Sequence, residues 1–435
     1  MMALPQPVRD CLDTLEAAGF DAWCVGGCVR DALLGLKPQD YDMCTSATPE
    51  EISRVFAHLP QVHNGEKHGT AGVIVDHCLY EITTFRTEGG YVDHRHPDWV
   101  RFVSDIKEDL QRRDFTVNAM AYSPARGLCD PFGGQNDLQN KVLRAVGDPE
   151  KRFSEDALRI LRGARFAARY SLNVEEKTEK AMFGLAPLME NLARERVFSE
   201  LCKLLLLAST QDLLRFAPLI TQVIPELAPA VGFDQRNTHH AFDVYTHTCH
   251  VVAGVAAELP LKWAALLHDV GKPATFTLDE AGQGHFLGHA KVSAALADAV
   301  LRRLKAPTAL REQAVFLIEK HMTPLEPDKK LLRRRLSRYG EENIRLLLAL
   351  QKADFGSKDV RGETQDFDNI AALLEEILAE NSCLSIRDLA VNGHDLMALG
   401  LEGPKIGETL QNLLEAVLED RLPNEKQALL EAVER

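Results

Sequence analysis

The spacing of hydrophobic and polar positions changes once along this chain, from a mixture of strand-like and helix-like patterns to an almost purely helical one. Up to about residue 145, short runs rich in β-branched and aromatic residues alternate with helical stretches. The runs 22–27, 41–47, 71–85 and 99–105 are typical of strands, whereas 8–19 and 28–35 are typical of helices. From about residue 146 onward, the apolar positions keep the helical period almost without interruption. The pattern predicts an α+β fold, in which a small sheet-containing unit is followed by helices.

Breaks in the helical pattern suggest further boundaries. Residues 223–240 are Pro-rich and weakly periodic, as expected of a linker, and the polar segment 354–366 is typical of a loop. A His-rich helical block lies between them. We therefore expect four segments, at residues 1–145, 146–232, 233–360 and 361–435.

Composition narrows the class of protein. Hydrophobic residues make up 45% of the 435 positions and charged residues 26%, which is ordinary for a globular protein. The net charge of −14 argues against a general nucleic-acid coat but leaves room for a local basic groove. The nine cysteines form no CxxC pair, the N-terminus lacks a signal-peptide pattern, and no apolar run approaches the ~18 residues of a membrane span. These features predict a cytoplasmic protein without a membrane segment.

The first candidate site is "DYD". A strand over residues 40–44 would project Asp40 and Asp42 from one face, and adjacent carboxylates repel unless a cation lies between them. Mg²⁺ is the expected cation, and two such ions can activate a hydroxyl and stabilise a leaving pyrophosphate. Gly26 and Gly27 allow backbone amides to approach a triphosphate, and Arg30 follows on the next helix. D-x-D alone also fits a solvated surface turn.

Glu81 lies in the strand-like run 71–85 and is a candidate third carboxylate. An ordinary surface position on a strand fits it equally well.

The second candidate site is "RRDFTVNA". Arg112 and Arg113 suit phosphate or ribose oxygens, and Asp114 and Asn118 can hydrogen-bond sugar hydroxyls. A basic helix start with an internal salt bridge is the alternative.

The third candidate site is "SEDALRILRGARFAARY", in which Ser154 is a candidate helix cap and Asp156 and Arg159 share a helix face. Cytosine and adenine each offer an amino donor beside a ring-nitrogen acceptor, which Asp156 and Arg159 would complement, whereas uracil and guanine offer the reverse pattern. A solvated face with salt bridges is the plainer interpretation. The arginines of this helix fall on one third of its circumference: Arg159, Arg162, Arg165 and Arg169.

Four stretches, "VGGCVRDALLG", "DYD", "RRDFTVNAMA" and "FSEDALRILRGARFAA", resemble in order and spacing the class II tRNA nucleotidyltransferase and bacterial poly(A) polymerase superfamily. The C-terminal stretch "LAVNGHDLMALGLEGPKIGETLQNLLEAVLEDRLPNEKQ" resembles that of bacterial CCA-adding enzymes. The resemblance implies a polymerase-β-like nucleotidyltransferase head followed by an all-α neck, a body with an HD domain, and a tail that binds tRNA. It implies addition of C, C and A to tRNA 3′ ends from CTP and ATP.

The resemblance also assigns roles. Asp40 and Asp42 would be catalytic, and "RRD" would recognise ribose; Glu81 is added to the catalytic set as a candidate on its strand position alone. The E-D-x-x-R motif would choose the base, and residues 85–99 resemble a head loop used in switching from C to A. Addition of A only or CC only, and poly(A) synthesis, remain alternatives. Nucleotide binding is expected at Gly26, Gly27, Arg30, Arg113, Asp114, Asn118, Asp156, Arg159, Arg162 and Arg165.

The fourth candidate site is a histidine block that resembles HD-superfamily metal phosphohydrolases. The resemblance implies four metal ligands, His247, His268, Asp269 and Asp354, with His289 and His321 as candidates for a second ion or for phosphate contacts. Mixed imidazole and carboxylate ligands suit Mn, Ni, Co or Fe, with metal-bound water as the nucleophile. Bacterial CCA enzymes with such a domain can act as phosphatases or 2′,3′-cyclic phosphodiesterases. A degenerate structural domain is one alternative, and a phosphohydrolase whose head serves only to bind RNA is another.

Overall fold

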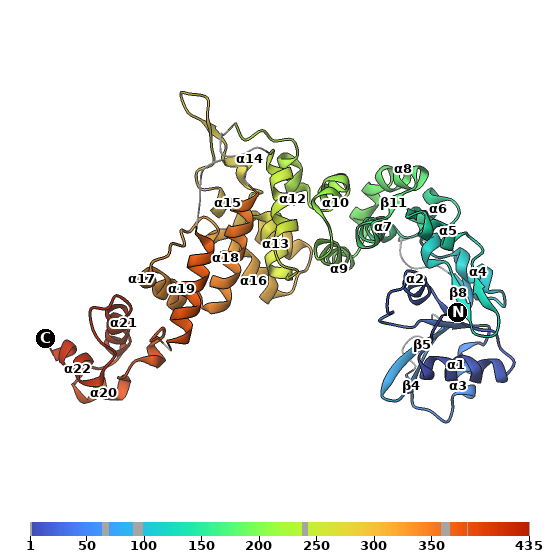
Figure 1. Cartoon of the computed structure of the whole chain (residues 1–435), viewed down its shortest axis with the longest axis horizontal. Helices are drawn as coiled ribbons and strands as arrows, with labels where there is room; N and C mark the ends of the chain where they lie inside the picture. Colours follow the sequence, from blue (N-terminus) through green and yellow to red (C-terminus); the bar gives the residue numbers. More distant parts are fainter. Residues whose placement is uncertain are drawn as a thin grey trace. The chain divides into compact units, whose positions relative to one another are not determined.

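The computed structural model describes residues 2–62, 69–89, 99–236, 242–357, 366–380 and 382–434. Its contacts divide the chain into two compact units, Met1–Pro225 and Glu226–Arg435, and the division falls inside the Pro-rich segment expected to be a linker (Figure 1). Most of the expected head loop, residues 90–98, lies outside the described residues.

The first unit is built on a mixed sheet with the strand order β3-β4-β5-β2-β1-β8-β9. Only β2 and β5 pair in parallel within it, with Met43 opposite Ile82. The strands of this sheet are β1 (Ala22–Val25), β2 (Met43–Thr45), β3 (Gln61–Val62), β4 (Thr70–Val75), β5 (Cys78–Thr84), β8 (Ala121–Ser123) and β9 (Gly127–Cys129). The other described strands form two-stranded pairs: β6 (Arg86–Gly89) with β7 (Trp99–Phe102), β10 (Val142–Leu143) with β11 (Asn173–Val174), and, in the second unit, β12 (Thr277–Leu278) with β13 (Gly284–His285).

Helices cover this sheet and then continue without it. The helices up to the end of the sheet are α1 (Gln6–Ala17), α2 (Gly27–Leu33), α3 (Pro49–Val55), α4 (Ile106–Gln111), the 3₁₀ turn η2 (Thr116–Asn118) and α5 (Gly134–Gln139). Those that follow are α6 (Pro149–Glu155), α7 (Leu158–Tyr170), α8 (Glu176–Gly184), η3 (Ala186–Asn191), α9 (Arg194–Leu205), α10 (Thr210–Arg215), α11 (Ala217–Val223) and η4 (Pro225–Ala230). The expected α+β class is confirmed.

Local sequence explains how the head elements form and pack. Helix α1 buries Val8, Cys11, Leu12 and Leu15, a spacing of three and four residues that places them on one face. Helices α1 and α3 lie side by side against the sheet (Figure 1). Elsewhere in the head, β1 and α4 contribute to a core of Trp23, Val25, Cys44, Phe85, Ile106, Leu110, Ala119, Ala121 and Val146.

A glycine brings helix α5 against the turn η2. A Cβ on Gly134 would meet the backbone oxygen of Thr116 at 2.2 Å, so only glycine permits this approach. The contact fixes the turn that carries Asn118.

The second unit is helical. Its helices are α12 (Val244–Gly254), α13 (Leu259–Leu267), α14 (Lys272–Thr275), α15 (His289–Arg303), α16 (Thr308–Lys320), α17 (Lys329–Tyr339), α18 (Glu341–Gly356), α19 (Phe367–Ala379), η5 (Ile386–Asp388), α20 (Gly393–Ala398), α21 (Pro404–Leu418) and α22 (Lys426–Glu434). Every residue of α13 from Leu261 to Leu267 is buried, as expected for a central helix that α12, α15, α16 and α18 contact. A separate apolar cluster joins α20, α21 and α22.

Within the described residues, no helix is both long enough and apolar enough to cross a membrane.

Candidate active site and a histidine cluster

A cavity of about 570 Å³ opens in the first unit, between the head sheet and helices α7 and α9. It gathers residues from the three N-terminal candidate sites, although the first and third of these lie more than a hundred positions apart in the sequence. Eight arginines and four aspartates are among the described lining residues, so the cavity suits a polyanion. The lining residues are Gly26, Gly27, Arg30, Asp40, Asp42, Arg112, Arg113, Asp114, Asn118, Asp156, Leu158, Arg159, Arg162, Arg165, Phe166, Arg169 and Arg196.

Asp40 and Asp42 lie just before strand β2, which begins at Met43. The expected strand over 40–44 was therefore wrong at its start, and strand alternation does not by itself place the two carboxylates. Asp42 is nevertheless anchored to the sheet, because its carbonyl accepts a hydrogen bond from the Val25 amide at 3.0 Å. Desolvation raises the pKa of Asp42, Arg113 lowers it in part, and Asp40 raises it further. A cation bound between the two carboxylates would relieve this repulsion.

Glu81 is exposed on β5, the neighbour of β2. Because Met43 pairs with Ile82, Glu81 and Asp42 occupy neighbouring positions one step before that pair. Glu81 does not line the cavity. Among the described residues, it forms no group of three ligand atoms within 4.8 Å with Asp40 and Asp42.

The glycine pair shapes the entrance to helix α2. Gly26 has φ of +75° and precedes the helix, a conformation that L-residues rarely adopt. A Cβ on Gly26 would meet a guanidinium nitrogen of Arg113 at 3.0 Å. The glycine therefore lets an arginine that follows α4 come close to the turn.

Arg30 is held in a fixed orientation. Its Nε donates to Asp31 at 2.8 Å, and its Nη1 donates to the amide oxygen of Asn118. Its guanidinium also lies 4.4 Å from the ring centre of Tyr170, whose hydroxyl donates to Asp31 at 2.9 Å. A cation fixed on several sides needs little reordering to bind phosphate.

Asp109 holds the arginines of the second site, and the sequence interpretation missed it. This buried carboxylate accepts from Arg112 at 2.8 Å and from Arg113 at 3.2 Å. Burial raises the pKa of Asp109, but Arg113 and Arg112 lower it below its usual value. The signal was present as an acid three and four residues before two arginines at a helical spacing.

Asp114 is the centre of a second network. Its Oδ1 accepts from the Phe115 amide at 2.8 Å and from Asn118 at 3.0 Å, and its Oδ2 accepts from Arg162 at 2.7 Å. Burial raises the pKa of Asp114, but Arg162 and Asn118 outweigh burial and bring it to about 2. Asp114 is thus ionised and joins the head to α7.

Asp156 and Arg159 are placed differently from the expectation of one continuous helix. Helix α6 ends at Glu155 and α7 begins at Leu158, so Asp156 lies in the break and Ser154 lies inside α6 rather than at a cap. Asp156 accepts from the Leu158 amide at 3.1 Å and from Arg196 of α9 at 3.0 Å. Sequence reasoning missed Arg196, which a basic position on an otherwise half-buried helix could have indicated.

Arg159 is fixed mainly by backbone. Its guanidinium donates to the carbonyl oxygens of Arg152 and Arg112, each at 3.0 Å, and to Glu155 at 3.0 Å. Both members of the expected base-selecting pair are thus held by the protein and not by each other.

The arginine stripe of α7 packs around an aromatic ring. The guanidinium carbons of Arg162 and Arg165 lie 5.2 and 4.2 Å from the ring centre of Phe166, within cation–π distance. Arg165 also forms a buried ion pair with Glu200 of α9 at 2.6 Å. Phe166, which falls in the arginine sector of the helix, therefore supports the cations.

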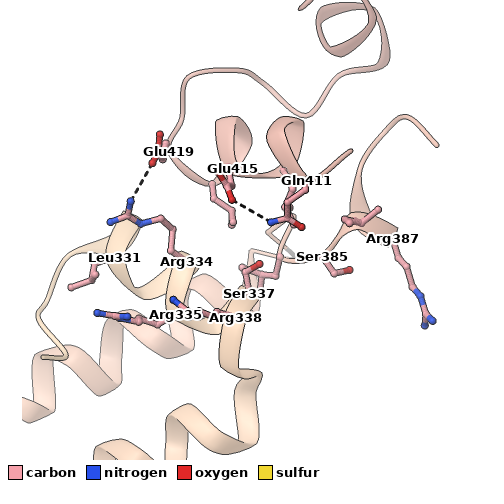
Figure 2. A pocket seen from close by; sticks show the side chains of 14 residues that line it. Leu331, Arg334, Arg335, Ser337, Arg338, Ser385, Arg387, Gln411, Glu415 and Glu419 are labelled. Atoms are coloured by element: carbon pink, nitrogen blue, oxygen red, sulfur yellow. Dashed lines mark hydrogen bonds and ion pairs between the residues drawn. The ribbon is translucent and has the colours of Figure 1, made fainter. Parts of the chain in front are cut away.

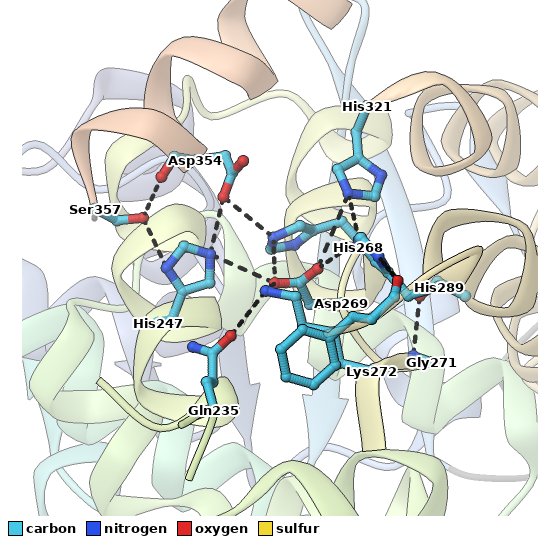
Figure 3. A network of polar contacts seen from close by, with 12 residues as sticks. Gln235, His247, His268, Asp269, Gly271, Lys272, His289, His321, Asp354 and Ser357 are labelled. Carbon is cyan, nitrogen blue, oxygen red and sulfur yellow. Dashed lines mark hydrogen bonds and ion pairs between the residues drawn. The ribbon is translucent and has the colours of Figure 1, made fainter. Parts of the chain in front are cut away.

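The histidine block forms a buried cluster in the second unit (Figure 3). The Nε2 atom of His247 lies 2.9 Å from Asp354, and that of His268 lies 3.2 Å from Oδ2 of Asp269. The other oxygen of Asp269 lies 3.3 Å from His289. Two groups of three ligand atoms within 4.8 Å result: His247, His268 and Asp354, and Asp269, His289 and His321. All six residues named from the sequence come together.

The far side of each ring fixes which nitrogen faces the cluster. The Nδ1 atoms of His268, His289 and His321 lie 2.9, 2.8 and 2.7 Å from backbone carbonyl oxygens, which can only accept. Nδ1 therefore carries the proton, and in the neutral ring Nε2 has a free lone pair. The Nε2 atoms of His289 and His321 face each other at 3.2 Å, and a cation bound beside them would relieve the repulsion of the two lone pairs.

The donor set fits a transition metal. Two ligands about 2.1 Å from a tetrahedral ion lie ~3.4 Å apart, close to the spacings observed here. Burial and the neighbouring His268 lower the pKa of His321 to about 4, so that ring is neutral and able to bind metal. Burial lowers the pKa of His268, but Asp269 outweighs burial and brings it to about 9, so a metal would displace a proton there.

Lys272 is a further member of the cluster that the sequence interpretation missed. Its buried ammonium lies 2.7 Å from Oδ2 of Asp269 and donates to Gln235 at 2.9 Å. The signal was its place three residues after Asp269.

A groove of about 1030 Å³ opens beside helix α17 in the second unit (Figure 2). Arg334, Arg335 and Arg338 project from α17, and Arg387 comes from η5. Arg334 pairs with Glu419 at 3.1 Å. Among the described residues, Arg335, Arg338 and Arg387 form no ion pair, although the chain as a whole is acidic.

Three family models match successive parts of the chain. Residues 22–144 match the "Poly A polymerase head domain", residues 171–231 match a "Probable RNA and SrmB-binding site of polymerase A", and residues 275–433 match a "tRNA nucleotidyltransferase domain 2 putative".

Relatives match over nearly the whole length. The chain is 36% identical to the CCA-adding enzyme of Streptococcus gordonii, over 98% of this chain and 97% of that protein. It is 37% identical to the CCA-adding enzyme of Limosilactobacillus fermentum, over 98% and 96%. Among solved structures, the Bacillus stearothermophilus CCA-adding enzyme in complex with CTP is 27% identical with a TM-score of 0.75, over 99% of this chain and 98% of that one. The chain belongs to the family of CCA-adding enzymes.

Proposed function

We propose that this protein completes tRNA 3′ ends by adding C, C and A from CTP and ATP, as a nucleotidyltransferase. The observation that carries the proposal is the single cavity in which Asp40 and Asp42 lie with the fixed pair Asp156 and Arg159. One cavity can then hold both the reacting phosphates and the base of the same nucleotide. Full-length relatives that are CCA-adding enzymes favour this activity over A-only addition, CC-only addition and poly(A) synthesis.

The chemistry of the head depends on a metal, generally Mg²⁺. Asp40 and Asp42 fit it, because two carboxylate oxygens and the nucleotide phosphates are the ligands that Mg²⁺ prefers. Asp40 and Asp42 would hold this metal, which when bound would supply activation of the attacking 3′-hydroxyl and stabilisation of the leaving pyrophosphate. Gly26, Gly27 and Arg30 would position the triphosphate, and Arg113, Asp114 and Asn118 would position the ribose. Arg162 and Arg165 add positive charge to the same cavity.

The choice of cytosine and adenine over uracil and guanine would come from the fixed positions of the Asp156 and Arg159 side chains. Asp156 is held by a backbone amide and Arg196, and Arg159 by two carbonyl oxygens and Glu155. A pair fixed in this way keeps one pattern of acceptor and donor that cytosine and adenine complement. Uracil or guanine would leave a buried polar group unpaired, at a cost of about 1–3 kcal/mol.

The groove beside α17 is suited to the tRNA backbone. Arginines without carboxylate partners attract phosphate oxygens and can bind them in bidentate fashion. We therefore assign Arg335, Arg338 and Arg387 to tRNA binding.

We also propose a second activity, a metal-dependent phosphohydrolase at the histidine cluster. The supporting observation is the set of imidazole Nε2 atoms and carboxylate oxygens that converge; backbone carbonyls fix the outer nitrogen of His268, His289 and His321, and the Ser357 hydroxyl contacts that of His247. His247, His268, Asp269 and Asp354 would bind one ion, and His289 and His321 would bind a second that shares Asp269. Mn, Ni, Co or Fe suits this set, and such a metal, when bound, would supply an activated water.

The Asp42→Asn variant should reduce nucleotide addition by about 100-fold or more, because metal stabilisation of the transition state is worth several kcal/mol. The assay gives the protein tRNA lacking its last three nucleotides, with labelled CTP alone, ATP alone, or both. Wild type should add CC with CTP alone, and A only after CC. The exposed Asp13→Asn serves as the control. Full addition by Asp42→Asn would contradict the catalytic assignment.

The double variant Asp156→Ala/Arg159→Ala should still add nucleotides but should lose discrimination against UTP and GTP by about 5- to 150-fold. Competition among all four nucleotides measures this ratio. Asp109→Asn is a useful comparison, because it removes the charge that holds the arginines of the second site but leaves the side chains of Asp156 and Arg159 unchanged. Unchanged selectivity in the double variant would overturn the templating role.

The variant Arg335→Ala/Arg338→Ala should weaken tRNA binding. It should also make the negative slope of log Kobs against log salt shallower, by about 0.7–0.9 for each phosphate that is no longer neutralised. Filter binding across a salt series measures both quantities. Arg345→Ala removes a charge from a site already paired with Glu341 and Glu375, and it should leave the slope unchanged. Equal slopes for both variants would exclude the groove as a phosphate site.

The His268→Ala and Asp269→Asn variants should lose bound metal by more than about 100-fold in affinity, because removal of a ligand's outer partner alone costs about 10- to 100-fold. Metal content is measured by mass spectrometry after dialysis against Mn²⁺ or Ni²⁺, alongside hydrolysis of p-nitrophenyl phosphate. His394→Ala, in the tail, is the control. Nucleotide addition should persist in these variants, just as hydrolysis should persist in Asp42→Asn. A wild-type protein that retains no metal would show the cluster to be structural.

A further inference from the structure

The mouth of the histidine cluster carries apolar side chains that the metal chemistry does not require. A cavity of about 240 Å³ is lined on its inner side by Asp269, Lys272, His289, His321 and Asp354. Its remaining wall includes Phe286, Leu287 and Met322, called here the apolar rim.

The rim is unusually exposed for its composition. Leu287 is 85% exposed and Met322 is 57% exposed. A single exposed Leu needs no explanation, but two large apolar side chains beside a buried polar cluster are the composition expected of a ligand site. Each lies close in the chain to a metal-ligand candidate: Leu287 is two residues before His289, and Met322 is directly after His321.

Phe286 gives the rim a fixed base. Its ring centre lies 5.5 Å from that of Phe276, and the Lys272 ammonium lies 5.3 Å from the Phe286 ring. Lys272 therefore contacts both Phe286 of the apolar rim and Asp269 of the histidine cluster, so the apolar and polar walls of the cavity belong to one site.

The cavity is too small to enclose a whole nucleotide, so only part of such a substrate would lie inside it. Pockets that enclose a whole drug-sized ligand measure about 300–1,000 Å³. The smaller space here has room for a phosphoryl group and part of a sugar, and leaves the rest of the substrate at the mouth, against the rim.

Charge argues against inorganic pyrophosphate, the product of nucleotide addition, as the substrate. The proposed metal ions would neutralise the phosphate that reaches the cluster, but the second phosphate of pyrophosphate is also charged and would require a further cation at the mouth. Lys272 is the one cation among the described lining residues outside the histidines, and it is already bonded to Asp269 and Gln235.

We propose that Leu287 and Met322 determine the substrate specificity of this site by holding the nucleobase or sugar of a nucleoside phosphate ester. The inference rests on the proposed phosphohydrolase function. In the reaction, the oxygen of a water molecule bonds to phosphorus, the bond from phosphorus to the sugar oxygen breaks, and that oxygen takes a proton. The products are inorganic phosphate and a free sugar hydroxyl, the group that nucleotide addition requires at a tRNA end.

The test compares wild type with Leu287→Ser/Met322→Ser and with the control Leu278→Ser. Leu278 is 47% exposed on the neighbouring strand β12 but does not line the cavity. Substrates for the Mn²⁺-loaded proteins are adenosine 2′- and 3′-monophosphate, an RNA with a 3′-terminal phosphate, glycerol 2-phosphate and pyrophosphate. Wild type should prefer the adenosine esters to glycerol 2-phosphate by about 10-fold or more in kcat/KM, which corresponds to the burial of one or two apolar groups. The rim variant should lose this preference through KM, with glycerol 2-phosphate unchanged.

A binding measurement tests the rim without turnover. Calorimetry with the metal-free proteins should show adenosine, the product, binding wild type and Leu278→Ser several-fold more tightly than the rim variant, and ribose should bind none of them.

The outcomes separate the two proposals. If wild type hydrolyses none of the esters, the phosphohydrolase function fails, and adenosine binding still decides whether the rim is a nucleoside site. If it hydrolyses all esters equally, or prefers pyrophosphate, and the rim variant behaves as wild type, the rim inference is wrong while the hydrolase stands. A higher kcat/KM for the RNA than for the free nucleotides would identify the RNA terminus as the source of the ester, and the reverse order would identify free nucleotides.

Discussion

The buried carboxylate of Asp114 is the contact on which the nucleotide cavity depends. It binds Arg162 of α7 on one side and the turn η2, through Asn118, on the other. Asn118 in turn accepts from Arg30, which belongs to the helix after the glycine pair. One ionised group thus links the elements that would bind triphosphate, ribose and base. Because an uncompensated buried charge costs several kcal/mol, these elements can only be displaced together.

The same principle governs the rest of the cavity. Asp109 fixes two arginines of the second site, Glu200 fixes Arg165, and Arg196 fixes Asp156. Each of these functional charges is held by a partner of opposite sign to which no chemical role is assigned. The arginine excess that remains is preorganised, so a bound polyanion gains electrostatic energy without a second entropic cost for ordering these side chains.

The sequence predicted most elements, because these depend on local patterns, and apart from Glu81 the motif residues that it named lie together in the head cavity and the histidine cluster. The helices around residues 8–19 and 28–35 and the strands of the head follow from periodicity, and the metal-ligand candidates followed from a resemblance. What could not be predicted is what holds these residues. Asp109 and Lys272 were within reach of helical spacing, but the pairing of Arg196 with Asp156 joins positions forty residues apart and depends on how α9 packs on α7. The break between α6 and α7 was missed because "SEDALRIL" keeps the helical period through it, and periodicity does not register a break of two residues.

The two polar sites solve opposite electrostatic problems. In the head cavity, arginines outnumber carboxylates. The excess positive charge offsets the repulsion between Asp40 and Asp42, and bound nucleotide phosphates would neutralise the rest. In the histidine cluster, imidazoles face two carboxylates with Lys272 as the fixed cation; burial drives His321 toward the neutral form, whereas Asp269 holds a proton on His268. Burial favours metal binding in the second site because it removes protons that compete for the same lone pairs. In the first site it makes the charges costly, so the protein must fix them with ion pairs. The difference explains why the head needed so many charged partners that the motifs do not contain, whereas three of the four rings of the cluster are held from behind by backbone carbonyls and the ring of His247 by the hydroxyl of Ser357.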